Sequence, residues 1–179
     1  MPLVKADRLT RIGAALLRAA GATEEEAEAV AIGCVNANLA GHDSHGVIAI
    51  PTYIDRIKVG HIVPGAKWTI VQETPTTTVI DGNWGFGFHV NARAMALTIE
   101  KAKTANVAAC TVFRQSHVGR LAAYPMMAMR EGMIGIAVLE SPLQLEMRLR
   151  SFLEHGGEGS GDKPAEDAAS ANPSPAGAA

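Results

Sequence analysis

The amino-acid sequence predicts an α/β fold in which N-terminal helices precede a mixed sheet with crossover helices. Residues 6–58 carry apolar side chains at helical spacing, residues 68–80 contain two short β-branched runs, and residues 107–138 follow a strand, helix, strand order. Strands connected through helices are typical of α/β domains. A length of 179 residues suits one domain with a tail, and a hydrophobic content of 47% is enough for a core.

Three helices are expected in the N-terminal part. Residues 6–20 have leucine and isoleucine side chains at helical spacing with arginines between them. The second helix begins with a capping box, in which the Thr23 side chain accepts from an amide three residues on and Glu26 reaches back. We expect it to end near Gly41. The third helix has Pro51 in its first turn, where proline is well tolerated.

The later part of the chain predicts the strands. The runs 68–73 and 76–80 are β-branched and predict a pair of strands. The continuous apolar run 107–113 is typical of a strand covered on both faces. A helix over 121–130 then leads to a second buried strand over 133–138. Such a crossover predicts that the runs 107–113 and 133–138 are parallel.

Residues 84–88, with the sequence Trp-Gly-Phe-Gly-Phe, place three aromatic rings on a glycine-bearing loop. These rings could lie against a ligand or cap the core. The core interpretation is favoured, because aromatic side chains near strand ends usually pack inward. A further helix is expected from Val90 to Lys103.

Composition excludes several classes of function. The formal net charge of −2 and the lack of any Lys/Arg-rich run argue against nucleic acid as a partner. No apolar run is long enough to span a membrane, and the first residues lack a signal-peptide core. Cys34 and Cys110 lie far apart in apolar segments, which indicates reduced thiols in a cytosolic protein. No zinc-binding motif is present, so no metal site is expected.

The sequence changes character near residue 139. Residues 151–179 are rich in Gly, Ala, Ser and Pro and offer almost no core-forming side chains. Such a composition predicts disorder. We therefore expect a folded portion over residues 1–138 and a divergent tail over 139–179.

The first candidate site is residues 41–46, with the sequence Gly-His-Asp-Ser-His-Gly between two apolar segments. Flanking glycines permit a tight turn, and histidine is suited to proton transfer near neutral pH. Two alternatives stay open. Gly41 could end one helix while Asp43 or Ser44 caps the next, with both histidines merely exposed. Alternatively, the two histidines and Asp43 could bind a metal, although the flanking glycines suggest a turn.

The second candidate site is residues 115–120, with the sequence Gln-Ser-His-Val-Gly-Arg. It follows the 107–113 strand and opens the next helix, a place where α/β proteins commonly bind ligands. Gly119 allows close approach, and Arg120 adds a cation suited to phosphate or carboxylate. Alternatively, His117 is a helix-start residue bonded to the backbone.

In combination, these motifs resemble the malate/L-lactate dehydrogenase family. The resemblance rests on residues 41–46, on Pro51 followed by Tyr53, on residues 79–82, and on residues 116–120, in that order. Within the family the pattern is most similar to the hydroxycarboxylate dehydrogenases, and it covers the chain to about Val138. It implies an oxidoreductase that uses NAD or NADP and acts on small 2-hydroxy or 2-oxo acids. It also implies a non-Rossmann fold, a cytoplasmic location, and a homodimer with the active site near the subunit interface.

The resemblance also implies roles for individual residues. Ser44 and His45 match a Ser-His pair in which the imidazole exchanges a proton with the substrate oxygen beside the nicotinamide. His117 matches a histidine that is assigned as the base in some members, so both histidines are candidates and His45 ranks first. Gly119, Arg120 and Leu121 match cofactor contacts.

Two departures from the family pattern qualify this expectation. Some members have a substrate-binding arginine four residues beyond the catalytic histidine, where this chain has Ala49. Carboxylate recognition would then come from elsewhere, with Arg120 as a candidate. From Leu139 onward the family pattern is not recognisable, as if the chain were truncated and continued in unrelated sequence. The expectation is therefore either a dehydrogenase or an incompetent fragment of one.

Overall fold

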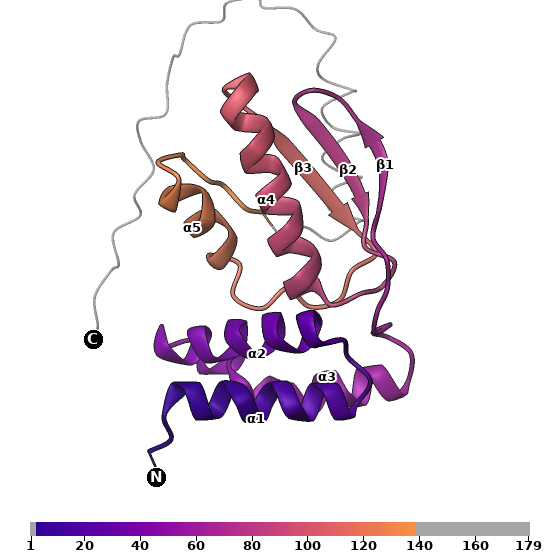
Figure 1. Cartoon of the computed structure of the whole chain (residues 1–179), viewed down its shortest axis with the longest axis vertical. Helices are drawn as coiled ribbons and strands as arrows, with labels where there is room; N and C mark the ends of the chain where they lie inside the picture. The colour runs from indigo at the N-terminus through magenta and orange to yellow at the C-terminus, as the bar shows by residue number, and fades with distance from the viewer. Residues whose placement is uncertain (1–2, 139–179) are drawn as a thin grey trace, which may run out of the picture. The chain divides into compact units, whose positions relative to one another are not determined.

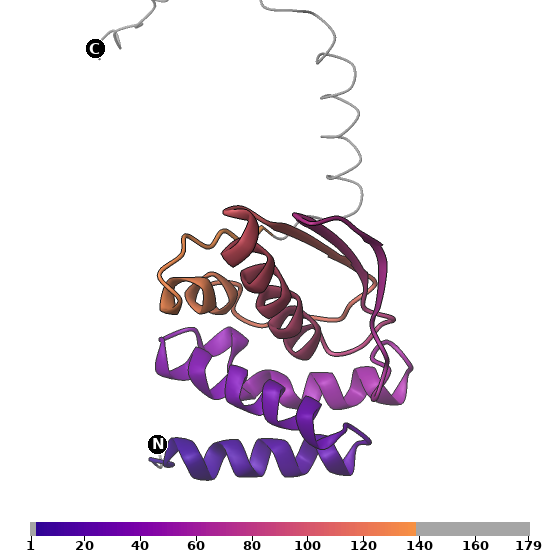
Figure 2. The same cartoon turned by 45° about the horizontal axis from the view of Figure 1, so that its top comes forward.

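A computed structural model describes residues 3–138 of the chain (Figure 1). These residues belong to one compact unit of the chain. The predicted disordered tail lies outside the described residues. Within this unit, three helices form one layer, and a sheet with two further helices stands on it (Figures 1 and 2).

The helical layer consists of α1 (Ala6–Ala19), α2 (Glu24–Leu39) and α3 (Ile50–Lys58), as the sequence predicts. The capping box of α2 is confirmed: the Glu26 amide donates to Thr23 Oγ1 at 3.3 Å, and the Thr23 amide donates to Glu26 Oε2 at 3.0 Å. Glu26 is almost fully buried, and its carboxylate also accepts from the Gly65 amide at 3.0 Å, which offsets part of the cost of burial. The same residue therefore starts α2 and anchors the loop that leaves the helical layer.

One apolar core joins this helical layer to Phe86 and Phe88 of the aromatic loop. It includes Cys34, which is buried, whereas Cys110 is only half-buried; both are free thiols. Burial raises the pKa of the Cys34 thiol to about 12, so the group stays protonated. Phe86 and Phe88 are 2% and 6% exposed, so the inward packing predicted for this aromatic loop is confirmed for these two rings, whereas Trp84 is half exposed.

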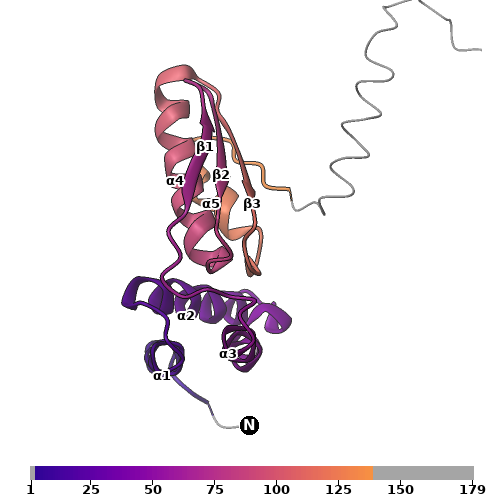
Figure 3. The same ribbon diagram turned by 90° about the vertical axis from the view of Figure 1, so that its right-hand side faces the viewer.

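The sheet has three strands in the order β1 (Thr69–Glu73), β2 (Thr77–Asp81) and β3 (Ala109–Phe113). β1 and β2 are antiparallel, as predicted, and β3 is parallel to β2. The connection between the parallel strands is α4 (Gly87–Ala105), which covers one face of the sheet (Figure 3). Ile80 of β2 packs beneath this helix with Val90 and Ala94.

The prediction of a buried strand over 133–138 is wrong for this structure. After α5 (Ala123–Arg130), the residues up to 138 form no strand, and Ile134 and Ile136 are 94% and 80% exposed. A strand requires a neighbour for its backbone groups. Within the described residues β3 pairs only with β2, while Gly135 lies so close to α5 that an added Cβ would be 2.8 Å from Pro125 Cα.

Two related expectations change with it. The parallel crossover is β2–α4–β3 and not a connection through α5. β3 is not covered on both faces within the described chain, since Phe113 is 40% exposed.

No helix in the described range is long and apolar enough to cross a bilayer.

Candidate active site

The first predicted site lies in the loop between α2 and α3. α2 ends at Leu39, Gly41 adopts a φ of +75°, and a short 3₁₀ helix, Asp43–His45, follows. The first half of the capping alternative is therefore right: Gly41 follows the end of α2 with a positive φ, which is easy only for glycine. Neither Asp43 nor Ser44 caps a helix, so the second half of that interpretation is wrong.

Asn38 fixes the shape of this loop. Its Nδ2 donates to Asp43 Oδ1 at 2.6 Å, and its Oδ1 accepts from the Val47 amide at 2.9 Å. Gly46 lies directly against the same amide group, where a Cβ would overlap Asn38. The sequence contained a sign of this role, because Asn38 is a polar residue on the otherwise apolar stripe of α2.

Ser44 and His45 form a pair in this loop. Ser44 Oγ lies 3.0 Å from Nδ1 of His45, with the serine exposed and the histidine half-buried. A hydroxyl both donates and accepts, so it can bond Nδ1 with or without a proton there. Nε2 is left for another partner. With a proton on Nδ1, Ser44 Oγ accepts from it and holds the ring in one orientation while Nε2 is free to exchange a proton.

His117 comes from the second predicted site and lies in the loop after β3. The start of α4 presses against this loop, since a Cβ on Gly87 would overlap the carbonyl oxygen of Ser116. The Ser116 amide also donates to Gly85 O at 3.0 Å. Because α5 begins only at Ala123, His117 is not a helix-start residue.

The fold brings the two predicted histidines together. The ring centroids of His45 and His117 are 5.6 Å apart with an interplanar angle of 29°. Tyr53 of α3 stacks on His117 at 5.8 Å, and Phe88 meets it edge-on at 6.3 Å. Two polar motifs that are distant in the sequence thus form one cluster with two aromatic rings.

The Nδ1 atom of His117 has two neighbours that can donate a hydrogen bond. Tyr53 Oη lies 2.8 Å away, and the Gly119 amide donates at 3.2 Å. Burial, followed by the positive charges of His45 and Arg56, holds the pKa of His117 below its usual value. The sequence predicted that Tyr53 lies on the apolar side of α3 and belongs to a motif. It did not predict the hydrogen bond between Tyr53 and His117.

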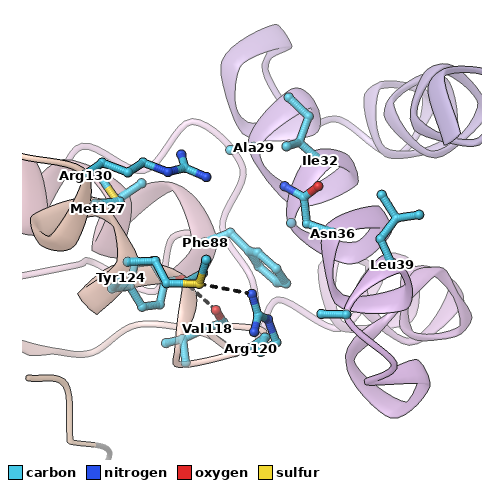
Figure 4. A pocket seen from close by; sticks show the side chains of 15 residues that line it. Ala29, Ile32, Asn36, Leu39, Phe88, Val118, Arg120, Tyr124, Met127 and Arg130 are labelled. Carbon is cyan, nitrogen blue, oxygen red and sulfur yellow. Dashed lines mark hydrogen bonds between the residues drawn. The ribbon is translucent and has the colours of Figure 1, made fainter.

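A groove of about 490 Å³ adjoins this cluster, between α2, α4 and α5 (Figure 4). Its wall is mainly apolar and includes Phe88, which also contacts His117. Arg120 and Arg130 line it, and none of the described lining residues is acidic. Arg120 contacts Met126 Sδ at 3.5 Å. Of the predicted cofactor contacts, Arg120 therefore faces the groove, whereas half-buried Leu121 does not line it.

The metal-site alternative finds no support in the described residues. His42 Nδ1 lies 3.0 Å from Ala40 O, a contact within its own turn. Across residues 3–138 no group of three or more His, Cys, Asp or Glu side chains is placed to hold a metal ion.

The described chain thus combines a three-stranded mixed sheet, a helical layer and a histidine pair. The family model for malate/L-lactate dehydrogenase matches residues 4–147, so the chain belongs to this family. The match continues past Val138, where the resemblance was expected to stop.

Several relatives are similar to the chain. L-sulfolactate dehydrogenase of Methanocaldococcus jannaschii is 40% identical over 69% of this chain, and hydroxycarboxylate dehydrogenase B of Escherichia coli O157:H7 is 37% identical over 68%. The crystal structure of malate dehydrogenase from Entamoeba histolytica matches 73% of the chain with a TM-score of 0.71 and 39% identity. These matches confirm the predicted non-Rossmann fold of this family.

The chain is much shorter than these relatives. It spans 36% of the sulfolactate dehydrogenase, 34% of the hydroxycarboxylate dehydrogenase and 37% of the Entamoeba structure. The comparisons therefore concern about one third of each relative.

Proposed function

We propose that the chain is an NAD(P)-dependent oxidoreductase that interconverts small 2-hydroxy acids and 2-oxo acids. In this proposal His45 exchanges the proton with the substrate oxygen, and Ser44 orients it. The observation that carries the proposal is the Ser44 Oγ to His45 Nδ1 contact at 3.0 Å, with the His117 ring stacked on His45. Membership of the family supplies the class of reaction.

The reaction sets the requirement that His45 would meet. Reduction of a 2-oxo acid adds a hydride to the carbonyl carbon and a proton to its oxygen, so one 2-oxo acid, one NAD(P)H and one proton give one 2-hydroxy acid and one NAD(P)⁺. A bound nicotinamide cofactor supplies or accepts the hydride. His45 Nε2 would give the proton to the oxygen in reduction and take it back in oxidation, while Nδ1 keeps its own proton and donates it to Ser44 Oγ throughout.

The groove beside the histidine pair fits an anionic cofactor. Its volume of about 490 Å³ lies within the range usual for ligand sites, and its mainly apolar wall carries Arg120 and Arg130. Arginine binds phosphate and carboxylate oxygens well. Of the expected cofactor contacts only Arg120 lines this groove, and His45, Gly119 and Leu121 are proposed as contacts on the family resemblance alone. Because Ala49 stands at the position of the substrate-binding arginine, Arg120 is also the candidate for the substrate carboxylate.

Further properties are proposed on the family resemblance alone. They are a homodimer with the active site near the subunit interface, a cytoplasmic location, and the use of either NAD or NADP. Light scattering of the purified chain would test the dimer, and a single-subunit mass would contradict it.

One observation favours a second candidate function. The chain spans only about a third of its relatives, 36% of the sulfolactate dehydrogenase for example. The alternative is therefore an incompetent fragment that retains the proton-transfer part of the site but has no turnover. Turnover by the 179-residue chain separates the two candidates.

The test compares His45→Ala with His42→Ala during NADH oxidation in the presence of pyruvate, glyoxylate or hydroxypyruvate. His42 is a matched control because it lies in the same loop but has an exposed ring whose Nδ1 lies 3.0 Å from Ala40 O. General acid catalysis contributes about 10² to 10⁴ in rate. We expect a loss of that size for His45→Ala and little change for His42→Ala. Wild-type rates in a folded His45→Ala protein would refute the role.

A further inference from the structure

The proton on His117 can be located from its hydrogen-bond neighbours. The Gly119 backbone amide lies 3.2 Å from Nδ1 of His117 and can only donate. Accepting that bond requires a free lone pair, so Nδ1 carries no proton. In the neutral ring the proton is then on Nε2. Tyr53 Oη, 2.8 Å from the same Nδ1, must also donate.

Both donors are held rigidly. Tyr53 is 3% exposed and lies between His117 and Phe88, whose ring it meets edge-on. Burial raises the pKa of its phenol, which therefore keeps its proton. Gly119 has a φ of +69°, and a Cβ there would overlap the Phe88 ring. Neither donor can turn away without repacking the cluster.

A second proton on His117 would be strongly opposed. It would place an N–H at Nδ1 against the Gly119 N–H, which removes that hydrogen bond and leaves the Tyr53 hydroxyl to turn and accept. It would also put a cation 5.6 Å from the His45 ring, and both His45 and Arg56 act to lower the pKa of His117. Like charges at this range disfavour the second protonation. These contacts therefore favour the neutral form of His117.

We propose that Tyr53 is a positioning residue which, together with the Gly119 amide, holds His117 as the neutral Nε2–H tautomer. His117 then presents a fixed hydrogen-bond donor and leaves proton transfer to His45. The assignment of proton transfer to His45 rests on the proposed function. The assignment of the His117 tautomer rests only on its hydrogen bonds and is independent of that function.

The test is a long-range ¹H–¹⁵N NMR spectrum of the full chain with ¹⁵N-labelled histidine, recorded across a pH series without cofactor or substrate. The His117→Gln variant identifies the signals of His117. The variants are Tyr53→Phe and, as a matched control, Tyr124→Phe. Tyr124 is also a buried tyrosine, but its hydroxyl donates to Val118 O at 2.6 Å and not to His117.

The wild-type spectrum is expected to show neutral His117 with its proton on Nε2. Loss of one donor in Tyr53→Phe should raise the measured pKa of His117 by roughly 0.5 to 1. Tyr124→Phe should leave it unchanged. A proton on Nδ1 in the wild type, or equal His117 titrations in the two variants, would overturn the proposal. Because the spectra need no turnover, a chain without dehydrogenase activity would refute the proposed function and leave this inference standing.

Discussion

Replacement of Gly119 by alanine is the sharpest structural perturbation of the site. Gly119 adopts a φ of +69°, and an added Cβ would overlap the Phe88 ring. The left-handed conformation costs a non-glycine residue about 1–2 kcal/mol. Forcing an extra carbon into a packed contact costs about 1–3 kcal/mol more. Gly119→Ala should therefore lower the free energy of unfolding by roughly 2–5 kcal/mol, from the sum of these two effects.

Gly60 provides the control, because it has a φ of +75° and no atom lies within 4 Å of an added Cβ. Gly60→Ala should cost only the conformational part, about 1–2 kcal/mol. Urea unfolding of the full chain, followed by the fluorescence of its two tryptophans, measures both variants. Equal losses for Gly119→Ala and Gly60→Ala would refute the packing of Phe88 against the His117 loop.

Two further predictions concern the loops around the site. Asn38→Ala removes two hydrogen bonds and should lower the free energy of unfolding by about 1–3 kcal/mol. The control Asn36→Ala changes an exposed side chain of the same helix and should alter this free energy little. Equal urea midpoints for the two variants would contradict the role of Asn38 in fixing the loop. The Arg114 guanidinium holds the pKa of the Asp81 carboxyl below its usual value. This ion pair therefore stabilises the fold fully above a pH of about 4, the usual pKa of an aspartate, and the stabilisation is lost as the pH falls through the lower pKa of Asp81 in the folded chain. Arg114→Gln should weaken this acid dependence in thermal unfolding, and an unchanged pH profile would contradict it.

The helical layer was predictable because its determinants are local. The periodicity of residues 6–20, the capping box at Thr23 and the proline at position 51 each act within a few residues, and each predicted element is present. The antiparallel pair β1 and β2 was predictable for the same reason, since the two runs are separated only by a short turn.

The segment 133–138 was not predictable in this way. Its apolar, β-branched composition favours a strand, but a strand forms only where a neighbouring backbone pairs with it. In the described chain Gly135 instead lies against α5, and β3 has one paired edge. Composition contains no information about which neighbour is present.

The site was predictable in its parts but not in its assembly. Residues 41–46 and 115–120 stand out as polar motifs beside apolar segments, and the fold brings His45 and His117 together. The hydrogen bond from Tyr53 to His117 joins a helix to a distant loop. Such a contact depends on three-dimensional packing and has no local pattern in the sequence.

Titration of the purified 179-residue chain with NADH and NADPH, followed by loss of the reduced-cofactor absorbance with small 2-oxo acids, shows whether this chain is itself a dehydrogenase. We expect saturable binding of one of the two cofactors, turnover with at least one 2-oxo acid, and weaker binding in Arg120→Ala. A folded chain that binds neither cofactor and oxidises neither would contradict the proposed dehydrogenase function. The chain would then be a fragment without turnover.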